Sequence, residues 1–324
     1  MTRLDVRQDA RAYGDIMGQI LAAAGSVADA AAFTALDEPA RRALLIASMP
    51  SGGTTPAATT GDIPRDGLEP LAADTLLLFE VLHRAIARFG PTCVGTAIIS
   101  LTRSPADVLS VLWLWRFARG RAAARGEPVS AGDIDIAPLF EKINDLTHAH
   151  ETLAAILDEP AYREHLRGRG DRQVVMVGYS DSTKDGGYFS ACCGLQHAQS
   201  HLHAAAASRG VALTFFHGRG GSLGRGGGPA ARGILSLPPE ALDGSLRLTE
   251  QGEVLAERYD DVEVACRHLE QVSWATLVAS SVRRAEPQRE WTDVAARMAE
   301  RSWEVYRELV DQPGFIRYFS QTTP

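Results

Sequence analysis

Short apolar segments rich in β-branched residues alternate along the chain with longer segments of helical periodicity. Six of the short segments predict strands: Leu4–Val6, Val94–Ser100, Ile134–Phe140, Val174–Tyr179, Leu213–Phe216 and Leu246–Leu248. Strands that alternate with helices are typical of a parallel sheet with crossover helices. The pattern therefore predicts an α/β fold.

Most of these segments are apolar throughout, as strands covered on both faces usually are. An open doubly wound sheet and a (β/α) barrel both have such strands, so the pattern leaves both folds open. In either fold, polar residues that directly follow a strand lie at the carboxyl end of the sheet, where parallel α/β proteins carry their chemistry.

Two helices can be placed from their own sequence signals. Ser104, Pro105 and Asp107 form a capping box with proline in the first turn, and the run VLSVLWLWRFA that follows is apolar on most sides. This run predicts a buried helix. Later in the chain, large apolar residues recur on roughly one helical face: Trp291, Val294, Met298, Val305 and Leu309.

The segment from Pro50 to Gly67 is rich in proline, glycine and threonine, which predicts a flexible surface loop. No other segment resembles a linker between domains, and no internal repeat is present. The whole chain, residues 1–324, is therefore expected to form a single domain.

The composition of the chain argues against several classes of function. The formal net charge of −7 argues against a general nucleic-acid binder, although a local arginine cluster could still bind a small anion. The four cysteines show no CxxC spacing, which favours a reduced, cytoplasmic protein. The first residues contain no apolar signal segment, and no apolar run is long enough to cross a membrane.

The richest candidate for chemistry is VVMVGYSDSTKDGGYFSA, where a buried strand opens into a polar segment. Asp181 and Lys184 suit a metal carboxylate beside a phosphate-binding cation. Two familiar motifs fail here: a P-loop needs glycine where Thr183 stands, and the serine–lysine motif of penicillin-binding enzymes needs serine at Asp181. The alternative is a polar turn with a salt bridge.

A second candidate is LTFFHGRGGSLGRGGGPAA, in which a strand leads to His217 and then to Arg219 and Arg225. Glycines allow the backbone to approach a ligand closely, and paired arginines can clamp a phosphate or carboxylate. The alternative is an arginine–glycine segment that binds RNA. Such segments usually carry many repeats, and the negative net charge also disfavours this interpretation.

Two further groups could bind a metal. Glu141 follows the strand IDIAPLF, and if it meets Asp181 on a neighbouring strand, the two carboxylates suit magnesium or manganese. His197 and His201 have the i, i+4 spacing of metal ligands. They lack the glutamate of a HExxH motif and a third ligand, so we interpret them as ordinary residues of a helix surface.

Taken together, GYSDSTKDGG, FHGRGGSLGRGGGP and LRLTEQGE closely resemble, in this order, the catalytic core of phosphoenolpyruvate carboxylase. Weaker similarities are LDVRQ, TAIISLTRSPADVL and APLFEKINDL. The resemblance implies an incomplete (β/α) TIM-type barrel with many additional helices. It also implies a cytoplasmic homo-oligomer that joins bicarbonate to phosphoenolpyruvate, giving oxaloacetate and phosphate, with Mg2+ or Mn2+.

The resemblance also implies roles for individual residues. Glu141 and Asp181 would be the metal ligands, and Arg7 and Lys184 would contact substrate and intermediate anions. A mobile glycine loop would begin at His217. Its substrate-binding residues would be Arg219, Gly220, Gly221 and Arg225. In this family phosphate passes to bicarbonate, forming carboxyphosphate and an enolate, and arginines, lysine and a divalent ion suit the charges involved.

The family chain is much longer, and a catalytic histidine that it carries in a Thr-Ala-His-Pro-Thr context is not found here. We therefore expect a barrel without its closing strands, and a chain that binds metal and phosphoenolpyruvate weakly without carboxylating at the family's rate. Two alternatives remain: an inactive fragment or split subunit that needs a complementary chain, and a non-catalytic phosphate- or nucleic-acid-binding protein. Glu141, Asp181 and Lys184 together argue against the second, because binding alone would not need metal carboxylates.

Overall fold

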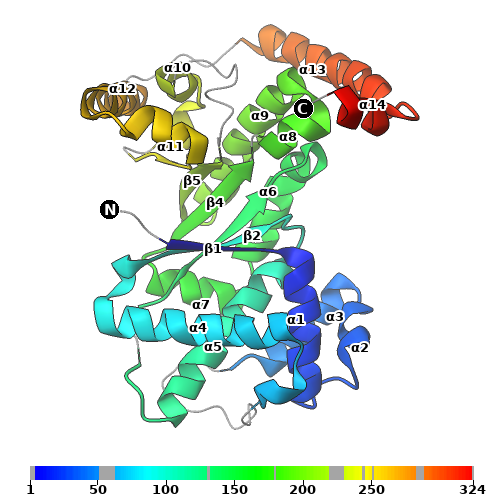
Figure 1. Cartoon of the computed structure of the whole chain (residues 1–324), viewed down its shortest axis with the longest axis vertical. Coiled ribbons are helices and arrows are strands. Elements are labelled where there is room, and N and C mark those ends of the chain that lie inside the picture. The colour runs from blue at the N-terminus through cyan, green and yellow to red at the C-terminus, as the bar shows by residue number, and fades with distance from the viewer. Residues whose placement is uncertain are drawn as a thin grey trace. The chain divides into compact units, whose positions relative to one another are not determined.

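The computed structural model describes residues 4–50, 63–129, 132–178, 180–218, 230–242, 245–249, 252–281 and 288–322 (Figure 1). The chain divides into two compact units. Unit 1 comprises Met1–Leu139, Glu151–Val175 and Ala205–Leu213, and unit 2 comprises Phe140–His150, Met176–Ala204 and Thr214–Pro324. Both units are discontinuous in sequence. The expectation of a single domain stays a prediction.

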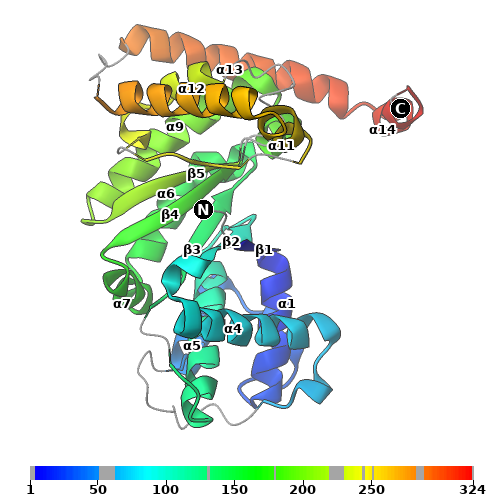
Figure 2. The same cartoon turned by 60° about the vertical axis from the view of Figure 1, so that its left-hand side comes forward.

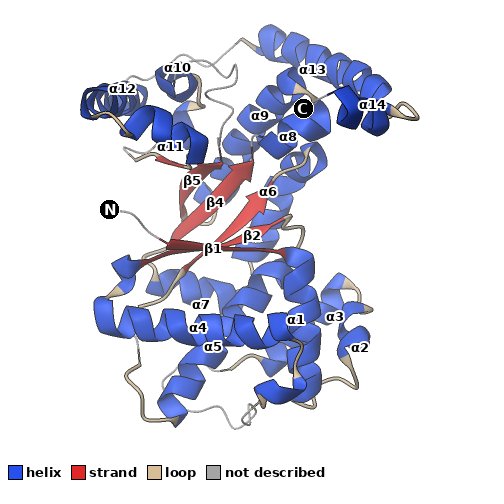
Figure 3. Ribbon diagram, viewed as in Figure 1, coloured by secondary structure: helices blue, strands red, loops and turns tan. Residues whose placement is uncertain are grey.

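All six predicted strands are confirmed, β2 with the predicted ends and the others with shifted ends; Figure 3 draws the strands in red. They are β1 (Leu4–Asp9), β2 (Val94–Ser100), β3 (Asp135–Phe140), β4 (Arg172–Gly178), β5 (Ala212–Gly218) and β6 (Arg247–Leu248). Their order in the sheet is the order in the chain, β1-β2-β3-β4-β5-β6. A doubly wound sheet reverses direction at a switch point, and the described strands have none. The sheet is therefore consistent with an incomplete α/β barrel.

Parallel pairing fixes the register of the strands. Arg7 on β1 lies opposite Ile98 on β2, and Ile98 lies opposite Ala137 on β3. At the other end of the sheet, Phe216 on β5 pairs with Arg247 on β6. All seven residues of β2 are buried, as expected for a strand covered on both faces.

Unit 1 contains most of the large buried side chains. Its helices are α1 (Ala10–Ala23), α2 (Ala30–Thr34), α3 (Glu38–Ser48), α4 (Pro70–Phe89), α5 (Pro105–Ala124) and α7 (Pro160–Gly168). The predicted capping box between Ser104 and Asp107 is present at the start of α5. Trp113 and Trp115 are fully buried on this helix, as its sequence predicted. Helices α1, α4 and α5 contact one another, and Figures 1 and 2 show them together.

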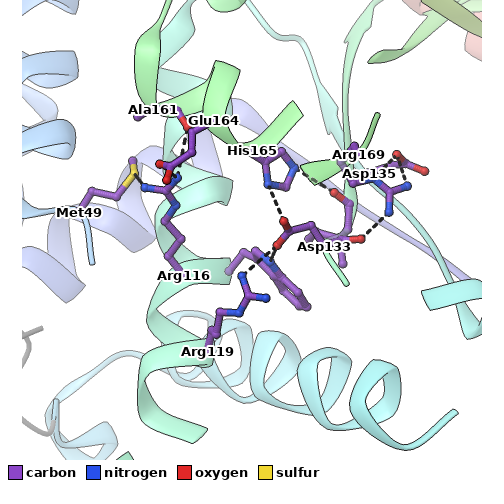
Figure 4. Close-up of polar contacts among 11 residues, drawn as sticks. Met49, Arg116, Arg119, Asp133, Asp135, Ala161, Glu164, His165 and Arg169 are labelled. Atoms are coloured by element: carbon purple, nitrogen blue, oxygen red, sulfur yellow. Dashed lines mark hydrogen bonds and ion pairs between the residues drawn. The ribbon is translucent and has the colours of Figure 1, made fainter. Parts of the chain in front are cut away.

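A polar network in unit 1 surrounds the start of β3 (Figure 4). The carboxylate of Asp133 accepts hydrogen bonds from Trp115 Nε1 at 2.8 Å and from Arg119 at 3.3 Å. Arg169 donates to the carbonyl of Asp133 at 2.6 Å and pairs with Asp135 at 2.5 Å. These bonds connect α5 and α7 to the segment entering β3.

Helices α6 (Ile143–Leu157) and α9 (Tyr188–Ala207) contain residues of both units. The helices that lie in unit 2 are α8 (Ser180–Gly186), α10 (Ala230–Leu235), α11 (Gly252–Tyr259), α12 (Val262–Ser281), α13 (Arg289–Val310) and α14 (Phe315–Thr322). Helix α12 contacts both α10 and α11. Helix α13 confirms the late amphipathic helix predicted from sequence. In the described residues, no helix combines the length and apolar character needed to cross a membrane.

The expected loop from Pro50 to Gly67 can be compared with the structure only in part. Residues 51–62 lie outside the described residues. Ile63 is buried, whereas Pro64, Asp66 and Gly67 are exposed, and Arg65–Gly67 form a short 3-10 turn.

Candidate functional site

The polar segment after β4 forms the short helix α8, for which a polar turn was the alternative interpretation. Asp181 lies in its first turn and Lys184 in its last. Lys184 Nζ lies 3.2 Å from Asp181 Oδ1, and the two side chains are 72% and 50% exposed. An exposed ion pair of this kind contributes little to folding, about 0–1 kcal/mol. Both charged groups are therefore open to solvent and to ligands.

Glu141 directly follows β3 and is buried. Strands β3 and β4 are neighbours in the sheet, as the sequence-based argument for pairing Glu141 with Asp181 required. The hydroxyl of Ser182 lies within hydrogen-bonding distance of two carbonyl oxygens, those of Glu141 and of Gly178, the latter at 2.9 Å. Because a hydroxyl carries one proton, the two carbonyls share it. Ser182 thus ties helix α8 to the ends of both strands.

Two further contacts hold the same strand ends. A Cβ added to Gly178 would lie 3.1 Å from both Cα and Cγ of Glu141, so a larger residue here would require Glu141 to shift by a few tenths of an ångström. The carboxylate of Asp185 accepts a hydrogen bond of 2.9 Å from the backbone N–H of Ile143, at the start of α6. The residues that follow β3 and β4 are therefore bound to each other at several points.

The two candidate ligands can be compared with the ligands that a magnesium ion usually has in proteins. Magnesium is usually held by one or two carboxylates and keeps several waters, some of which substrate oxygens replace. Glu141 and Asp181 follow adjacent strands, and their two carboxylates match the number and type of protein ligands in this pattern. No group of three or more histidine, cysteine, aspartate or glutamate residues within the described part of the chain could hold a metal by itself.

His217 lies on β5 and is buried. Its carbonyl accepts a hydrogen bond of 3.0 Å from Thr249 N, and its backbone pairs with Leu248 of β6. The guanidinium of Arg247 lies 4.1 Å from the centre of the Phe216 ring. His217 therefore lies within β5, next to its last residue Gly218, whereas the sequence placed it directly after the strand. The remaining predicted residues of the glycine loop, Arg219, Gly220, Gly221 and Arg225, lie outside the described residues.

Arg7 belongs to unit 1, whereas Glu141, Asp181, Lys184 and His217 belong to unit 2. On β1, the exposed Arg7 donates from Nε to the hydroxyl of Ser100 at 2.6 Å. Ser100 is the last residue of β2, so the guanidinium of Arg7 lies beside the end of that strand. Its predicted contact with substrate stays a prediction.

The histidines of α9 have a neighbour that the sequence did not indicate. The rings of His201 and His150, the latter on α6, have centroids 5.2 Å apart. Burial, followed by the charges of His150 and His197, lowers the pKa of His201. His197 and His201 are both exposed on α9, as expected for residues of a helix surface.

Sequence reasoning missed the residues that support the candidate ligands. Ser182, Asp185 and Gly178 were visible within the motif, but nothing in the sequence distinguished their structural contacts. Tyr306 on α13 donates from its hydroxyl to the carbonyl of Lys184 at 2.7 Å. It lies 122 positions away in the chain, and no local signal points to it.

Comparison with known proteins gives consistent matches over the whole chain. The phosphoenolpyruvate carboxylase family model matches residues 1–324. The phosphoenolpyruvate carboxylase of Xanthomonas campestris pv. campestris (strain 8004) is 42% identical over 330 residues, covering 100% of this chain and 34% of that protein. The enzyme of the same name from Roseiflexus castenholzii is 38% identical, covering 99% and 33%. That from Mycobacterium leprae is 39% identical, covering 99% and 34%. The chain thus spans about a third of the length of these relatives.

Proposed function

The chain belongs to the phosphoenolpyruvate carboxylase family, and on this premise we propose that it supplies the metal-binding and anion-binding part of that enzyme. The reaction would join bicarbonate to phosphoenolpyruvate and release oxaloacetate and phosphate. Glu141 and Asp181 would hold Mg2+ or Mn2+, and Lys184 would bind a phosphate or carboxylate group of the substrate.

One observation carries this proposal. The ends of β3 and β4 are joined through Ser182, and the segments after them carry a buried Glu141 and an exposed Asp181–Lys184 pair. An exposed ion pair such as Asp181–Lys184 contributes little to stability, so its place beside a second carboxylate at the same sheet edge favours a role in binding. A pair of carboxylates beside a cation suits a divalent ion and a phosphorylated substrate.

Each candidate residue would have its own role in binding the metal and the substrate. When bound, the divalent ion would stabilise negative charge that develops on substrate oxygens. Lys184 would exchange its contact with Asp181 for one with a substrate anion, which its exposure of 72% permits. Arg7, Arg219 and Arg225 would bind the remaining anionic groups, with the glycine loop that begins at His217 excluding water.

A second candidate is that carboxylation needs further polypeptide, in the same chain or in a complementary one. The exposed face of α13 favours this candidate, because large apolar side chains lie along it: Trp291, Val294, Met298, Val305 and Leu309. Trp291 is 63% exposed and Leu309 is 58% exposed. A continuous apolar stripe on a helix usually marks a surface that other protein covers. The chain would then bind metal and substrate anions but not complete the reaction by itself.

The experiment is bicarbonate-dependent formation of oxaloacetate from phosphoenolpyruvate and Mg2+ by the purified chain, with Mn2+ binding measured in parallel. Activity that Lys184→Ala removes would support complete function, and the matched control Arg301→Ala removes another cation of an exposed i, i+3 pair. Mn2+ binding without activity would support the second candidate.

Asp181→Asn tests the metal assignment itself, and we expect it to abolish Mn2+ binding. Asp158→Asn is its control, because Asp158 is also an exposed carboxylate paired with a cation, Arg209, at 2.7 Å. Equal Mn2+ affinity in wild type and Asp181→Asn would show that the proposed site is wrong.

A further inference from the structure

Helix α8 is too short to be stable by itself. It spans Ser180–Gly186, and isolated helices of this length do not persist in water. The last four carbonyls of any helix also lack partners within it. One of these, on Thr183, accepts a hydrogen bond of 2.8 Å from Gly187 N. The orientation of Asp181 and Lys184 therefore depends on what holds α8 from outside.

Helix α13 holds the carboxyl end of α8. The hydroxyl of Tyr306 donates to the carbonyl of Lys184 at 2.7 Å, which satisfies another of the terminal carbonyls. Helices α8 and α13 are in contact, and both belong to unit 2 (Figure 1). Tyr306 thus fixes the backbone of the same residue whose side chain pairs with Asp181.

The glycines after Lys184 allow this close packing. A Cβ added to Gly187 would lie 3.1 Å from Cγ of Tyr306, whereas one added to Gly186 would lie 2.5 Å from Cγ1 of Ile143 and in ordinary contact, 3.4 Å, with Cδ1 of Trp303. Gly187 also has a positive φ of 77°, which side-chain-bearing residues rarely adopt. Trp303 and Tyr306 are three positions apart and so share a face of α13.

We infer that Tyr306 is a positioning residue for the metal- and anion-binding pair Asp181–Lys184. The inference rests on the proposed function, because it gives Tyr306 a role through those two residues. With Ser182 bound to the strand ends and Tyr306 bound to Lys184, α8 is held at both ends. Loss of the Tyr306 hydroxyl would leave the strand-end bond intact and release the end that carries Lys184.

The test uses the full chain and needs no turnover. The Kd for Mn2+ and the thermal unfolding midpoint are measured for wild type, Tyr306→Phe, Tyr318→Phe and Asp181→Asn. Tyr318 on α14 is 66% exposed, so its variant is a matched control for loss of a tyrosine hydroxyl. We expect Tyr306→Phe to weaken Mn2+ binding about three- to tenfold, the effect of one lost hydrogen bond. Its unfolding midpoint should equal that of Tyr318→Phe.

The outcomes separate this inference from the proposed function. A purely structural role for Tyr306 would lower the midpoint and leave the Kd unchanged, which would overturn the inference. Weak binding by Asp181→Asn with wild-type binding by Tyr306→Phe would overturn the inference alone. Equal binding by wild type and Asp181→Asn, or no Mn2+ binding by wild type, would overturn the metal site and the positioning role with it.

Discussion

The hydroxyl of Ser182 donates to the backbone carbonyl of Glu141, 41 positions earlier in the chain. Ser182 is fully buried in the first turns of α8, while Glu141 follows β3. The same hydroxyl lies 2.9 Å from the carbonyl of Gly178 at the end of β4. One buried side chain therefore connects the segments that carry both candidate metal ligands, so its loss should affect stability and metal binding together.

We expect Ser182→Ala to lower the free energy of unfolding by about 1–3 kcal/mol, because two buried carbonyls lose a shared donor. Mn2+ affinity should fall as well. Urea unfolding and Mn2+ titration measure the two effects. Ser208→Ala is the matched control, since its hydroxyl is exposed; it donates to the carbonyl of Ala205 at 3.0 Å and accepts from Arg209 at 3.3 Å. An unchanged Kd for Mn2+ in Ser182→Ala would show that the Ser182 hydrogen bonds do not position the metal ligands.

Gly178→Ala should displace Glu141 without removing any polar group. The added Cβ would lie 3.1 Å from Glu141 Cα, a backbone atom that cannot rotate away. Such overpacking costs about 1–3 kcal/mol. We expect weaker Mn2+ binding and a lower unfolding free energy. Gly14→Ala on α1 is the control, because a Cβ there meets nothing within 4 Å. If both variants bind Mn2+ as wild type does, Gly178 does not position Glu141.

The strands could be predicted because their signals are local. Runs such as Val94–Ser100 are β-branched and apolar, and burial on both faces of the sheet requires that composition. The positions of Glu141 and Asp181 followed from the same argument, since each comes just after a strand. The order of the strands could not be predicted, because a barrel and a doubly wound sheet share local patterns and differ only in pairing. Only the observed order separates them.

The contacts that hold helix α8 in place could not be predicted, because they join residues far apart in the sequence. The segment Ser180–Gly186 is rich in serine, aspartate and glycine, which have low helical propensity, so a polar turn was one of the two interpretations that the sequence left open. Contacts from Tyr306 and to Glu141 stabilise a helix there instead. Such tertiary contacts commonly override weak local preferences.

Glu80 offers a test of the core of unit 1. Its side chain is 7% exposed and pairs with Arg65 at 2.5 Å, Arg121 at 3.3 Å and Arg125 at 3.6 Å. Glu80→Gln would leave these cations without their buried counter-charge, and we expect a loss of about 3 kcal/mol in unfolding free energy. Glu304→Gln breaks an exposed pair with Arg301 and should cost below about 1 kcal/mol. Similar losses in both variants would contradict this account.

The buried imidazole of His165 should make the protein less stable in mild acid. Its Nε2 lies 3.0 Å from the carbonyl of Ile134, so the neutral ring donates there (Figure 4). Burial lowers the pKa of His165, and the charges of Arg169 and Arg116 act in the same direction, while Asp133, 4.0 Å away, acts against them. Below the ordinary pKa of about 6.5, the unfolded chain therefore binds a proton that the folded chain does not.

The sign of the effect follows from this difference in proton binding. The stability linked to His165 is fully present above about pH 6.5 and is lost as the pH falls from there toward the lowered pKa of the folded state.

We expect the unfolding free energy of wild type to fall between pH 7 and pH 5.5, and that of His165→Gln to fall less, as measured by urea unfolding at both pH values. A part of the loss should remain in the variant, because burial also lowers the pKa of His83. His148→Gln removes an exposed histidine and should keep the wild-type dependence. If His165→Gln lost as much stability as wild type over this range, the acid sensitivity would have to come from other groups.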